Sequence, residues 1–228
     1  ERSVELLGRL HSTGSWPHSH PTTARNVKRS VIHERLEKAG AHFGESSGWE
    51  SASWFAPVDA DIEFKFTYAR QDWFEFHAAE HRAVRSAVAL FDLSSMSKFL
   101  VQGPDAEAFL LRSCAGYMAR KPGSVIYTAV LNDRGTFESD ITAHRIAEDH
   151  YRLFVGTAAI KRDLAWFRRH AEGFDVTLTD STEDYAVLGL MGPEAARIAA
   201  MVMEIRGFGP VKEEAAETTR KEIAEAVT

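Results

Sequence analysis

The hydrophobic period of this chain changes near residue 90, and that change limits the folds open to it. Across residues 72–89, apolar side chains recur at three- and four-residue spacing, the pattern of an amphipathic helix. Beyond this point the chain contains short β-rich runs, with helical patterns at 105–113 and 158–171; the runs are 98–102, 125–132, 139–146, 151–155, 176–179 and 185–191. This alternation predicts an α+β fold, a mixed sheet with packed helices, over about residues 90–200.

A weak internal repeat marks two of these strand-to-helix junctions. Residues 101–110 and 190–199 each contain a strand pattern, a Gly-Pro pair, an acidic residue and an Ala-rich helical pattern. Pro104 and Pro193 are expected at the first helical position, where a missing N–H is harmless. The repeat indicates either two related halves or a common joint used twice.

The two ends of the chain have a different character from its middle. Residues 8–57 are rich in Gly, Ser, His and Trp, and we predict one helix at 26–39 that ends before Gly40, with connecting loop elsewhere. Residues 212–226 read as a charged helix, either solvated or partner-binding. The expected organisation is therefore an irregular strap, a folded domain and a charged helical tail, at residues 1–71, 72–200 and 201–228.

Composition excludes several classes of function. The 228 residues include 27 Lys plus Arg against 33 Asp plus Glu, and the resulting net charge of -6 argues against nucleic acid as a partner. No apolar run approaches the ~20 residues that span a bilayer, so no membrane partner is expected. Cys114 is the single cysteine, which fits a reducing compartment. The first residues lack the layout of a secretory signal. We therefore expect a cytoplasmic protein, or an organelle-matrix protein if a presequence has been removed.

An ordered series of short motifs resembles the glycine-cleavage T-protein (aminomethyltransferase) family. It begins with Glu-His-Arg-Ala-Val-Arg at 80–85 and Leu-Phe-Asp-Leu-Ser-Ser-Met-Ser-Lys-Phe at 90–99, and continues through 101–110, 127–132, 134–135, 140–142, 180–182 and 185–193. Upstream, Gly48-Trp-Glu and Trp54-Phe resemble the junction in dimethylglycine and sarcosine dehydrogenases or oxidases, where a flavin domain precedes a T-protein-like folate domain. Thr136 and the Gly156-Thr pair depart from free T-proteins, and both departures favour the dehydrogenase-fused branch.

The resemblance implies a function and its cofactors. It implies tetrahydrofolate-dependent one-carbon (methylene) transfer coupled to oxidative N-demethylation of a methylated glycine or related amine, with a small-molecule substrate. The chain shows no Gly-rich dinucleotide fingerprint, so FAD is expected only in a domain absent from this chain, with a flavin domain or subunit as partner in cis or in trans. The family's later Gly-Glu-x-Gly element and C-terminal barrel are also missing. The alternative is therefore a non-catalytic or truncated T-protein-like module of a larger amine oxidase.

Asp140 is the candidate catalytic residue. It matches the acidic residue that ends the family's Leu-Asn-x-x-Gly-Gly-x-x-x-Asp stretch, and it is expected to open a strand whose apolar neighbours desolvate it. A carboxylate there would orient the pterin side of the folate, stabilise cationic intermediates or accept a proton. The competing interpretation is an aspartate that caps a turn.

Five further residues are candidates for binding the folate. Met96 matches the family position that packs on the pterin, and Tyr127 lies where an aromatic wall is expected, although core packing explains either one. Asn132 is expected to orient the turn that presents Asp140. Thr142 and His144 should project to the same side as Asp140 if the strand alternates regularly.

Two other patterns suggest different chemistry. His-Ala-Ala-Glu-His at 77–81 matches the inverted zinc-protease motif. The pattern is short, and Glu80 already belongs to the T-protein resemblance, so no metal site is predicted. Cys114 has no evident basic partner in sequence and is interpreted as packing, not as a nucleophile.

Overall fold

The computed structural model describes residues 1–9, 19–60, 62, 65 and 67–205. The chain forms two compact units, one of residues 1–37, 43–53 and 92–187 and the other of residues 38–42, 54–91 and 188–228. We describe each unit by itself. The charged helix predicted at 212–226 lies outside the described residues. Among those that are described, no helix is long and apolar enough to span a membrane.

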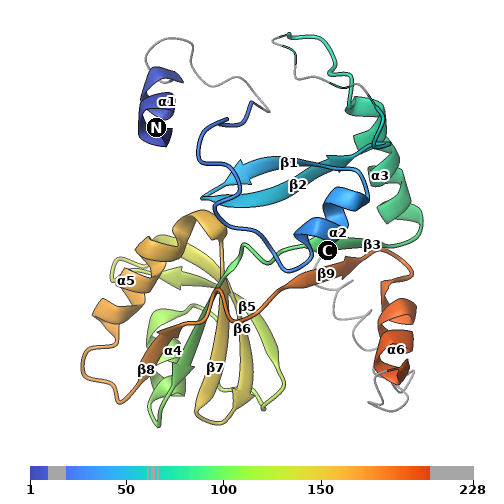
Figure 1. Ribbon diagram of the computed structural model, residues 1–228. Coiled ribbons are helices and arrows are strands. Elements are labelled where there is room, and N and C mark those ends of the chain that lie inside the picture. The colour runs from blue at the N-terminus through green and yellow to red at the C-terminus, as the bar shows by residue number, and fades with distance from the viewer. Residues whose placement is uncertain (10–18, 61, 63–64, 66, 206–228) are drawn as a thin grey trace. The chain divides into compact units, whose positions relative to one another are not determined.

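The larger unit is built on a five-stranded sheet with the strand order β5-β6-β7-β4-β8 (Figure 1). Its strands are β4 (Ser97–Gln102), β5 (Val125–Leu131), β6 (Phe137–Ala147), β7 (His150–Val155) and β8 (Thr177–Asp180). All four strand pairings are antiparallel. The helices α4 (Ala106–Ser113) and α5 (Ile160–His170) follow β4 and β7, the latter through the 3-10 helix η2 (Thr157–Ala159). The α+β fold class is thus confirmed, and the predicted elements between 98 and 180 coincide with observed ones.

One face of this sheet forms the core of the larger unit. Alternate strand residues such as Phe99, Ile141 and Leu153 are buried together with Phe109 of α4 and Phe167 of α5. The Phe167 ring meets those of Phe99 and Phe109 edge-on, at centroid distances of 6.4 and 6.2 Å. Because successive strand residues point to opposite faces, the remaining residues of these strands lie on the other face of the sheet, which neither helix covers.

A β-hairpin replaces the connecting loop that the sequence predicted between Gly40 and Pro57. Its strands are β1 (Ala41–Ser46) and β2 (Trp49–Phe55), and Ser47 and Gly48 link them. Both linking residues have positive φ, 53° and 87°, the conformation that two-residue hairpin turns require. The prediction was wrong because the Ser-Gly pair is a weak turn signal and the flanking strands lack clean alternation.

The helix predicted at 26–39 is also shorter than expected. Only α2 (His33–Lys38) is helical. Asn26 has φ of 61°, outside the helical region, and Lys28 pairs through its backbone with Gly48 and Glu50 of the hairpin. The first part of the predicted helix is therefore held as an extended segment. The predicted end is confirmed, since Gly40 follows with φ of 87°.

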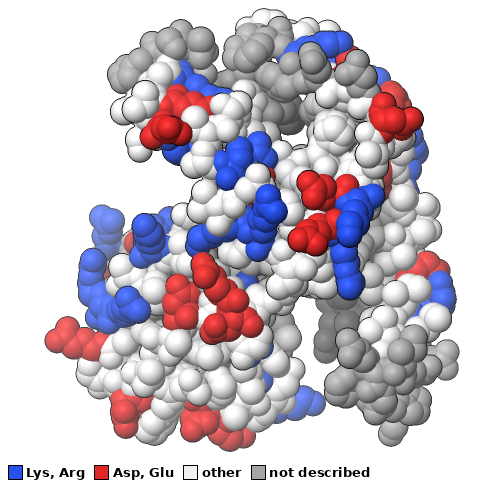
Figure 2. All heavy atoms as spheres, in the orientation of Figure 1, with Lys and Arg blue, Asp and Glu red and all other residues white. Residues whose placement is uncertain are grey.

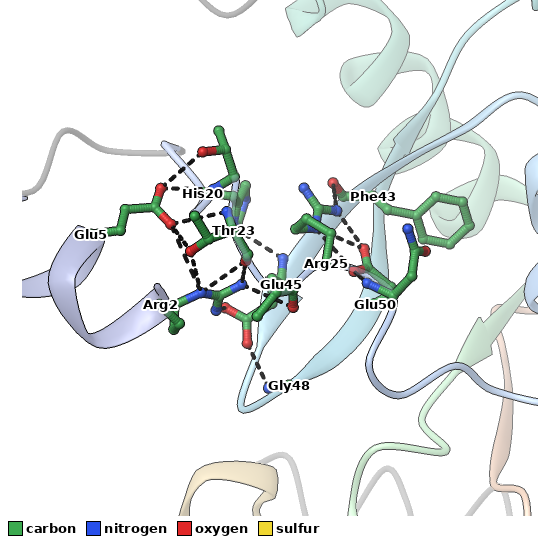
Figure 3. Close-up of polar contacts among 12 residues, drawn as sticks. Arg2, Glu5, His20, Thr23, Arg25, Phe43, Glu45, Gly48 and Glu50 are labelled. Carbon is green, nitrogen blue, oxygen red and sulfur yellow. Dashed lines mark hydrogen bonds and ion pairs between the residues drawn. The ribbon is translucent and has the colours of Figure 1, made fainter.

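A polar network ties the first helix, α1 (Arg2–Gly8), to residues 22–23 and to the hairpin within the larger unit (Figure 3). The Glu5 carboxylate accepts hydrogen bonds from the backbone N–H groups of Thr22 and Thr23, at 2.7 and 3.0 Å, and from both hydroxyls. These bonds, led by that from the Thr23 hydroxyl, lower the pKa of Glu5 from 4.5 to about 2. Arg2 forms an ion pair with Glu45 at 2.7 Å, so α1 contacts both segments.

The smaller unit contains α3 (Phe74–Ser86), the two-stranded sheet of β3 (Ala89–Asp92) and β9 (Leu188–Met191), and α6 (Ala195–Ile205). The helix predicted at 72–89 is confirmed as α3. β3 was not anticipated, and β9 begins three residues later than the predicted run at 185–191. In this unit the Trp54 ring stacks on the rings of His42 and Trp73, at centroid distances of 3.7 and 6.1 Å.

Each Gly-Pro pair links a strand to a helix, as the repeat predicted. β4 leads into α4 through Gly103, and β9 leads into α6 through Gly192. The prolines are not the first helical residues, because each lies two positions before the helix in a turn. Both glycines have positive φ, 137° and 121°. A Cβ on Gly103 would lie 2.3 Å from the Asp175 carbonyl oxygen, so the turn packs too closely for a side chain.

Candidate active site on the open face of the sheet

The open face of the five-stranded sheet carries most of the predicted site residues. Along β6, Ile141 and Ala143 are buried in the core. Asp140, Thr142 and His144 alternate with them and therefore project together onto the opposite face, as predicted. The period-two pattern of the strand was sufficient to predict this shared side.

Asp140 and Tyr127 form a hydrogen-bonded pair on this face. The Tyr127 hydroxyl donates to Oδ2 of Asp140 at 2.9 Å. The two residues are diagonal neighbours, because Tyr127 lies opposite Thr142 and Asp140 lies opposite Ala129. The hydrogen bond and the negative charge of Asp140 raise the pKa of Tyr127, which keeps the phenol protonated as a donor.

The surroundings of Asp140 differ from the expectation. The residue is exposed, so the prediction that apolar neighbours desolvate it was wrong for this chain in isolation. It is the fourth residue of β6 and not its first. Its carboxylate accepts from a tyrosine on the adjacent strand, a contact unlike the cap of a turn. Tyr127 is 73% exposed and does not belong to the core.

Asn132 organises the turn between β5 and β6. Its Oδ1 accepts hydrogen bonds from the backbone N–H groups of Arg134 and Thr136, at 3.0 and 3.2 Å. Its Nδ2 donates to Glu138 at 2.8 Å, and Gly135 within the turn has φ of 72°. These contacts agree with the predicted role in shaping the turn that leads to Asp140. They occupy both ends of the amide within the turn itself.

Met96 lies next to β4, three strands away from β5 in the same sheet. It is half-buried in the loop between β3 and β4, and its backbone N–H donates to the Leu93 carbonyl at 2.9 Å. Strands β7 and β6 lie between β4 and the strand that carries Tyr127. At about 4.8 Å per strand, the Met96 loop is roughly 14 Å from Tyr127. The structure therefore does not bring Met96 against the Tyr127–Asp140 pair.

Two residues that the sequence analysis missed share a row with Tyr127. In strand register, Tyr127 lies opposite Thr142, Thr142 opposite Phe154, and Phe154 opposite Lys98. Phe154 adds a second aromatic side chain to the open face. Lys98 is fully buried, and its Nζ donates to the Ser94 carbonyl at 2.7 Å. Burial lowers the pKa of this lysine. A lysine inside the apolar run at 98–102 was the available signal.

The His-Ala-Ala-Glu-His pattern at 77–81 and Cys114, which suggested other chemistry, both make contacts within the fold. The Glu80 carboxylate accepts a hydrogen bond from the Phe55 backbone N–H at 2.6 Å, and the His77 and His81 rings meet edge-on at 4.5 Å. Cys114 is buried in the core of the larger unit, and this burial raises the pKa of its thiol to about 12. A thiol with this pKa is a poor nucleophile near neutral pH.

Charge is unevenly distributed on the visible surface. Figure 2 shows basic side chains gathered over α5, whose sequence contains Lys161, Arg162, Arg168 and Arg169. Acidic side chains form separate groups elsewhere on the same face. The mixture of signs agrees with the small net charge.

Comparisons with known proteins place the chain in a family. The family described as GCVT N-terminal domain matches residues 32–210. The chain is 34% identical over 201 residues to 4-methylaminobutanoate oxidase (formaldehyde-forming) of Paenarthrobacter nicotinovorans, which covers 88% of this chain and 24% of that protein. It is 30% identical over 243 residues to the mitochondrial sarcosine dehydrogenase of Mus musculus, covering 90% of this chain and 26% of that protein.

A solved structure agrees with these matches. The glycine cleavage system aminomethyltransferase T from Bartonella henselae aligns with a TM-score of 0.61 and 28% identity, over 82% of this chain and 45% of that chain. The present chain thus spans about a quarter of the length of the two relatives above and less than half of the solved protein. On this evidence the chain belongs to the aminomethyltransferase, or glycine-cleavage T-protein, family, and residues 32–210 form its GCVT N-terminal domain.

Proposed function

We propose that this chain is the folate-binding part of an enzyme that transfers a methylene group to tetrahydrofolate during oxidative N-demethylation of a methylated glycine or related amine. Family membership supports the transfer. The names of two relatives, a sarcosine dehydrogenase and a 4-methylaminobutanoate oxidase, support a methylated amine as the source of the carbon. FAD would belong to a domain or subunit outside this chain.

The open face of the sheet has the groups that this reaction needs. Tyr127 and Phe154 provide flat aromatic surface for a pterin, and Thr142 lies between them in the strand register. Tetrahydrofolate, when bound, supplies the amine nitrogens that capture the oxidised carbon before water converts it to formaldehyde. The residues of this chain fit such a ligand, because an aromatic row lies beside a carboxylate.

The Tyr127–Asp140 pair is the observation that carries the proposal. A negative charge beside the folate amines stabilises the positive charge that develops as the carbon is captured, and it accepts the proton that leaves. The Tyr127 hydroxyl holds one carboxylate oxygen at 2.9 Å, which fixes the carboxylate in one orientation and leaves the other oxygen for the ligand. Asp140 is therefore the proposed catalytic residue.

The test is the product ratio of the full-length protein. Asp140→Asn keeps the shape of the side chain and removes its charge, so oxidation of the amine should continue while folate capture falls by about 10²- to 10³-fold. Product should shift from methylene-tetrahydrofolate towards formaldehyde. Asp133→Asn makes the same change at an exposed position in the β5–β6 turn and should leave the ratio as it is. An unchanged ratio in Asp140→Asn would remove Asp140 from catalysis.

A second function has one observation in its favour. One relative is named as formaldehyde-forming. If this chain is a non-catalytic or truncated module, the amine oxidase that contains it would release formaldehyde whether or not folate is present. If the full-length wild-type protein gives only formaldehyde with saturating tetrahydrofolate, this second function replaces the first.

A further inference from the structure

Arg152 carries a positive charge on the open face without a negative partner. It lies on β7, opposite His144 on β6 and Leu100 on β4, and is half-buried. Within the part of the chain that the structure describes, its guanidinium has no hydrogen-bond acceptor and no ion pair, and its Nε is buried without a partner. Its contact is with the Tyr185 ring, whose centroid lies 4.1 Å from the guanidinium carbon.

A second arginine of the same sheet, Arg145, has acceptors and negative charges around its guanidinium. Arg145, on β6, is buried and forms ion pairs with Glu107 at 2.6 Å and Glu148 at 2.7 Å, as well as a hydrogen bond to the Arg120 carbonyl at 2.7 Å. Buried polar groups in folded proteins almost always have such partners, because an unmet donor loses its bond to water. Four buried side-chain atoms among the described residues lack a partner, and the Nε of Arg152 is the only one of them that belongs to a guanidinium, a group suited to an anionic ligand.

We propose that Arg152, held on the face of Tyr185, is a carboxylate-binding site of this face and receives the glutamate portion of the folate. The proposal rests on the proposed function. A guanidinium presents paired donors that match the two oxygens of a carboxylate, and an aromatic ring on one side fixes the plane of those donors. Tyr185 thus orients Arg152, and Arg152 contacts the ligand.

The distance between Arg152 and Asp140 distinguishes two possible ligands, a methylated glycine and a folate, as the source of the carboxylate. His144, opposite Arg152, is four residues from Asp140 on β6, so Arg152 and Asp140 are separated by roughly 14 Å across and along the sheet. The carboxylate of a methylated glycine is one carbon from its amine nitrogen and would stay beside Asp140. The carboxylates of a folate are separated from its amines by the aminobenzoyl group and the glutamate backbone, which suits the longer distance.

Tyr185 also borders a cavity that gives the glutamate room. The cavity has a volume of about 410 Å³, and its lining includes Lys28, Arg29 and Glu183. Lys28 is paired with Glu183 at 3.1 Å. Together with Arg29, these charged side chains of the lining have one net positive charge. A second carboxylate of the same ligand would therefore meet a favourable charge beyond Arg152.

The test compares two ligands and two arginine variants in the full-length protein. Tetrahydrofolate and tetrahydropteroyl amide share the pterin and the aminobenzoyl group, but tetrahydropteroyl amide has neither the glutamate nor any carboxylate. Wild-type protein should bind tetrahydrofolate about 10- to 100-fold more tightly, the usual value of a charged hydrogen bond. In Arg152→Met, most of this preference should be lost, with only the small part that the charge of Arg29 supports remaining, and tetrahydropteroyl amide should bind as it does to wild type. Arg134→Met, in the exposed β5–β6 turn, is the matched control and should keep the preference.

The possible failures are distinguishable. If Arg152→Met keeps the wild-type preference, or if wild-type protein binds both ligands equally well, Arg152 is not the glutamate site although the proposed function stands. If wild-type protein binds neither ligand, the proposed function itself fails. If Arg152→Met instead raises the KM for the methylated amine and leaves the folate preference unchanged, the carboxylate belongs to the amine substrate and the assignment to folate is wrong.

Discussion

At the scale of single residues, glycines in turns are required by their backbone conformation and, at some positions, by the atoms around them. Gly103 combines φ of 137° with a neighbouring carbonyl 2.3 Å from the position of a Cβ. Gly173 has φ of 87° but open space around that position. Both positions impose the strain of a positive φ on a side chain, and Gly103 adds steric overlap and a φ further from the left-handed region open to other residues.

We expect Gly103→Ala to destabilise the protein more than Gly173→Ala. Strain alone should cost about 1–2 kcal/mol in Gly173→Ala. Gly103→Ala should add about 1–3 kcal/mol, because the Asp175 backbone must move to admit the methyl group. Denaturant unfolding of both variants measures the difference in free energy. Equal losses would show that the turn at Gly103 relaxes freely.

Cys114 should react slowly with thiol reagents in the folded protein. Its pKa of about 12, against an ordinary value of 9.0, lowers the thiolate fraction at pH 8 by about 1000-fold. A cysteine introduced at the exposed Glu172 in a Cys114→Ala background serves as the reference. Labelling of Cys114 should become as fast as the reference only in denaturant. Equally fast labelling of both cysteines in the folded state would contradict its burial.

At the scale of elements, α1 is held by polar contacts more than by packing. None of its residues is buried, and Val4 and Leu7 are 74% and 54% exposed. A helix of seven residues is not stable by itself in water. The Glu5 carboxylate, with its four hydrogen bonds to Thr22 and Thr23, is therefore expected to decide whether α1 stays docked.

Docking of α1 should depend on pH through Glu5. The pKa of the Glu5 carboxylate is lowered from 4.5 to about 2. Its contribution to the docking of α1 is therefore complete above about pH 4.5 and is lost as the pH falls towards 2. Hydrogen exchange at the Thr22 and Thr23 amides should be faster in Glu5→Gln than in wild type above pH 4.5, and this difference should shrink towards pH 2. Glu37→Gln, at an exposed position, should match wild type throughout. A difference that does not vary with pH would rule out the carboxylate as its cause.

At the scale of the whole molecule, the chain contains one wall of the proposed folate site. Tyr127 and Asp140 are exposed on the open face. Ligand pockets usually bury most of the surface of a bound small molecule, which a single open face does not do. The aminomethyltransferase of Bartonella henselae is more than twice as long as the region it shares with this chain.

We therefore expect these 228 residues alone to bind tetrahydrofolate weakly and to bind no flavin. Calorimetry should give a dissociation constant well above that of the full-length protein, and the purified chain should show no flavin absorbance. A tight, stoichiometric folate complex would show that the open face is a complete site. A yellow protein would show that flavin binds here after all.

The sequence by itself determined the elements between residues 98 and 180 and the side of β6 on which Asp140, Thr142 and His144 lie. Both follow from local periodicity, since alternation in a strand and three- to four-residue spacing in a helix are fixed by backbone geometry. The resemblance to T-proteins rested on short motifs in order along the chain, and the family match over residues 32–210 confirms it.

Tertiary structure decided what depends on partners distant in sequence. Extended pairing of Lys28 with the hairpin stopped a helical pattern from forming a helix, because hydrogen bonds to Gly48 and Glu50 replaced those within the helix. The pairing of β5 with β6 brought Tyr127 diagonally to Asp140. The register places Leu100 on β4 and His144 on β6 opposite Arg152, and neither residue provides a carboxylate for it. Strand register is set by the packing of a whole face, so no local pattern in the sequence predicts which side chains meet across it.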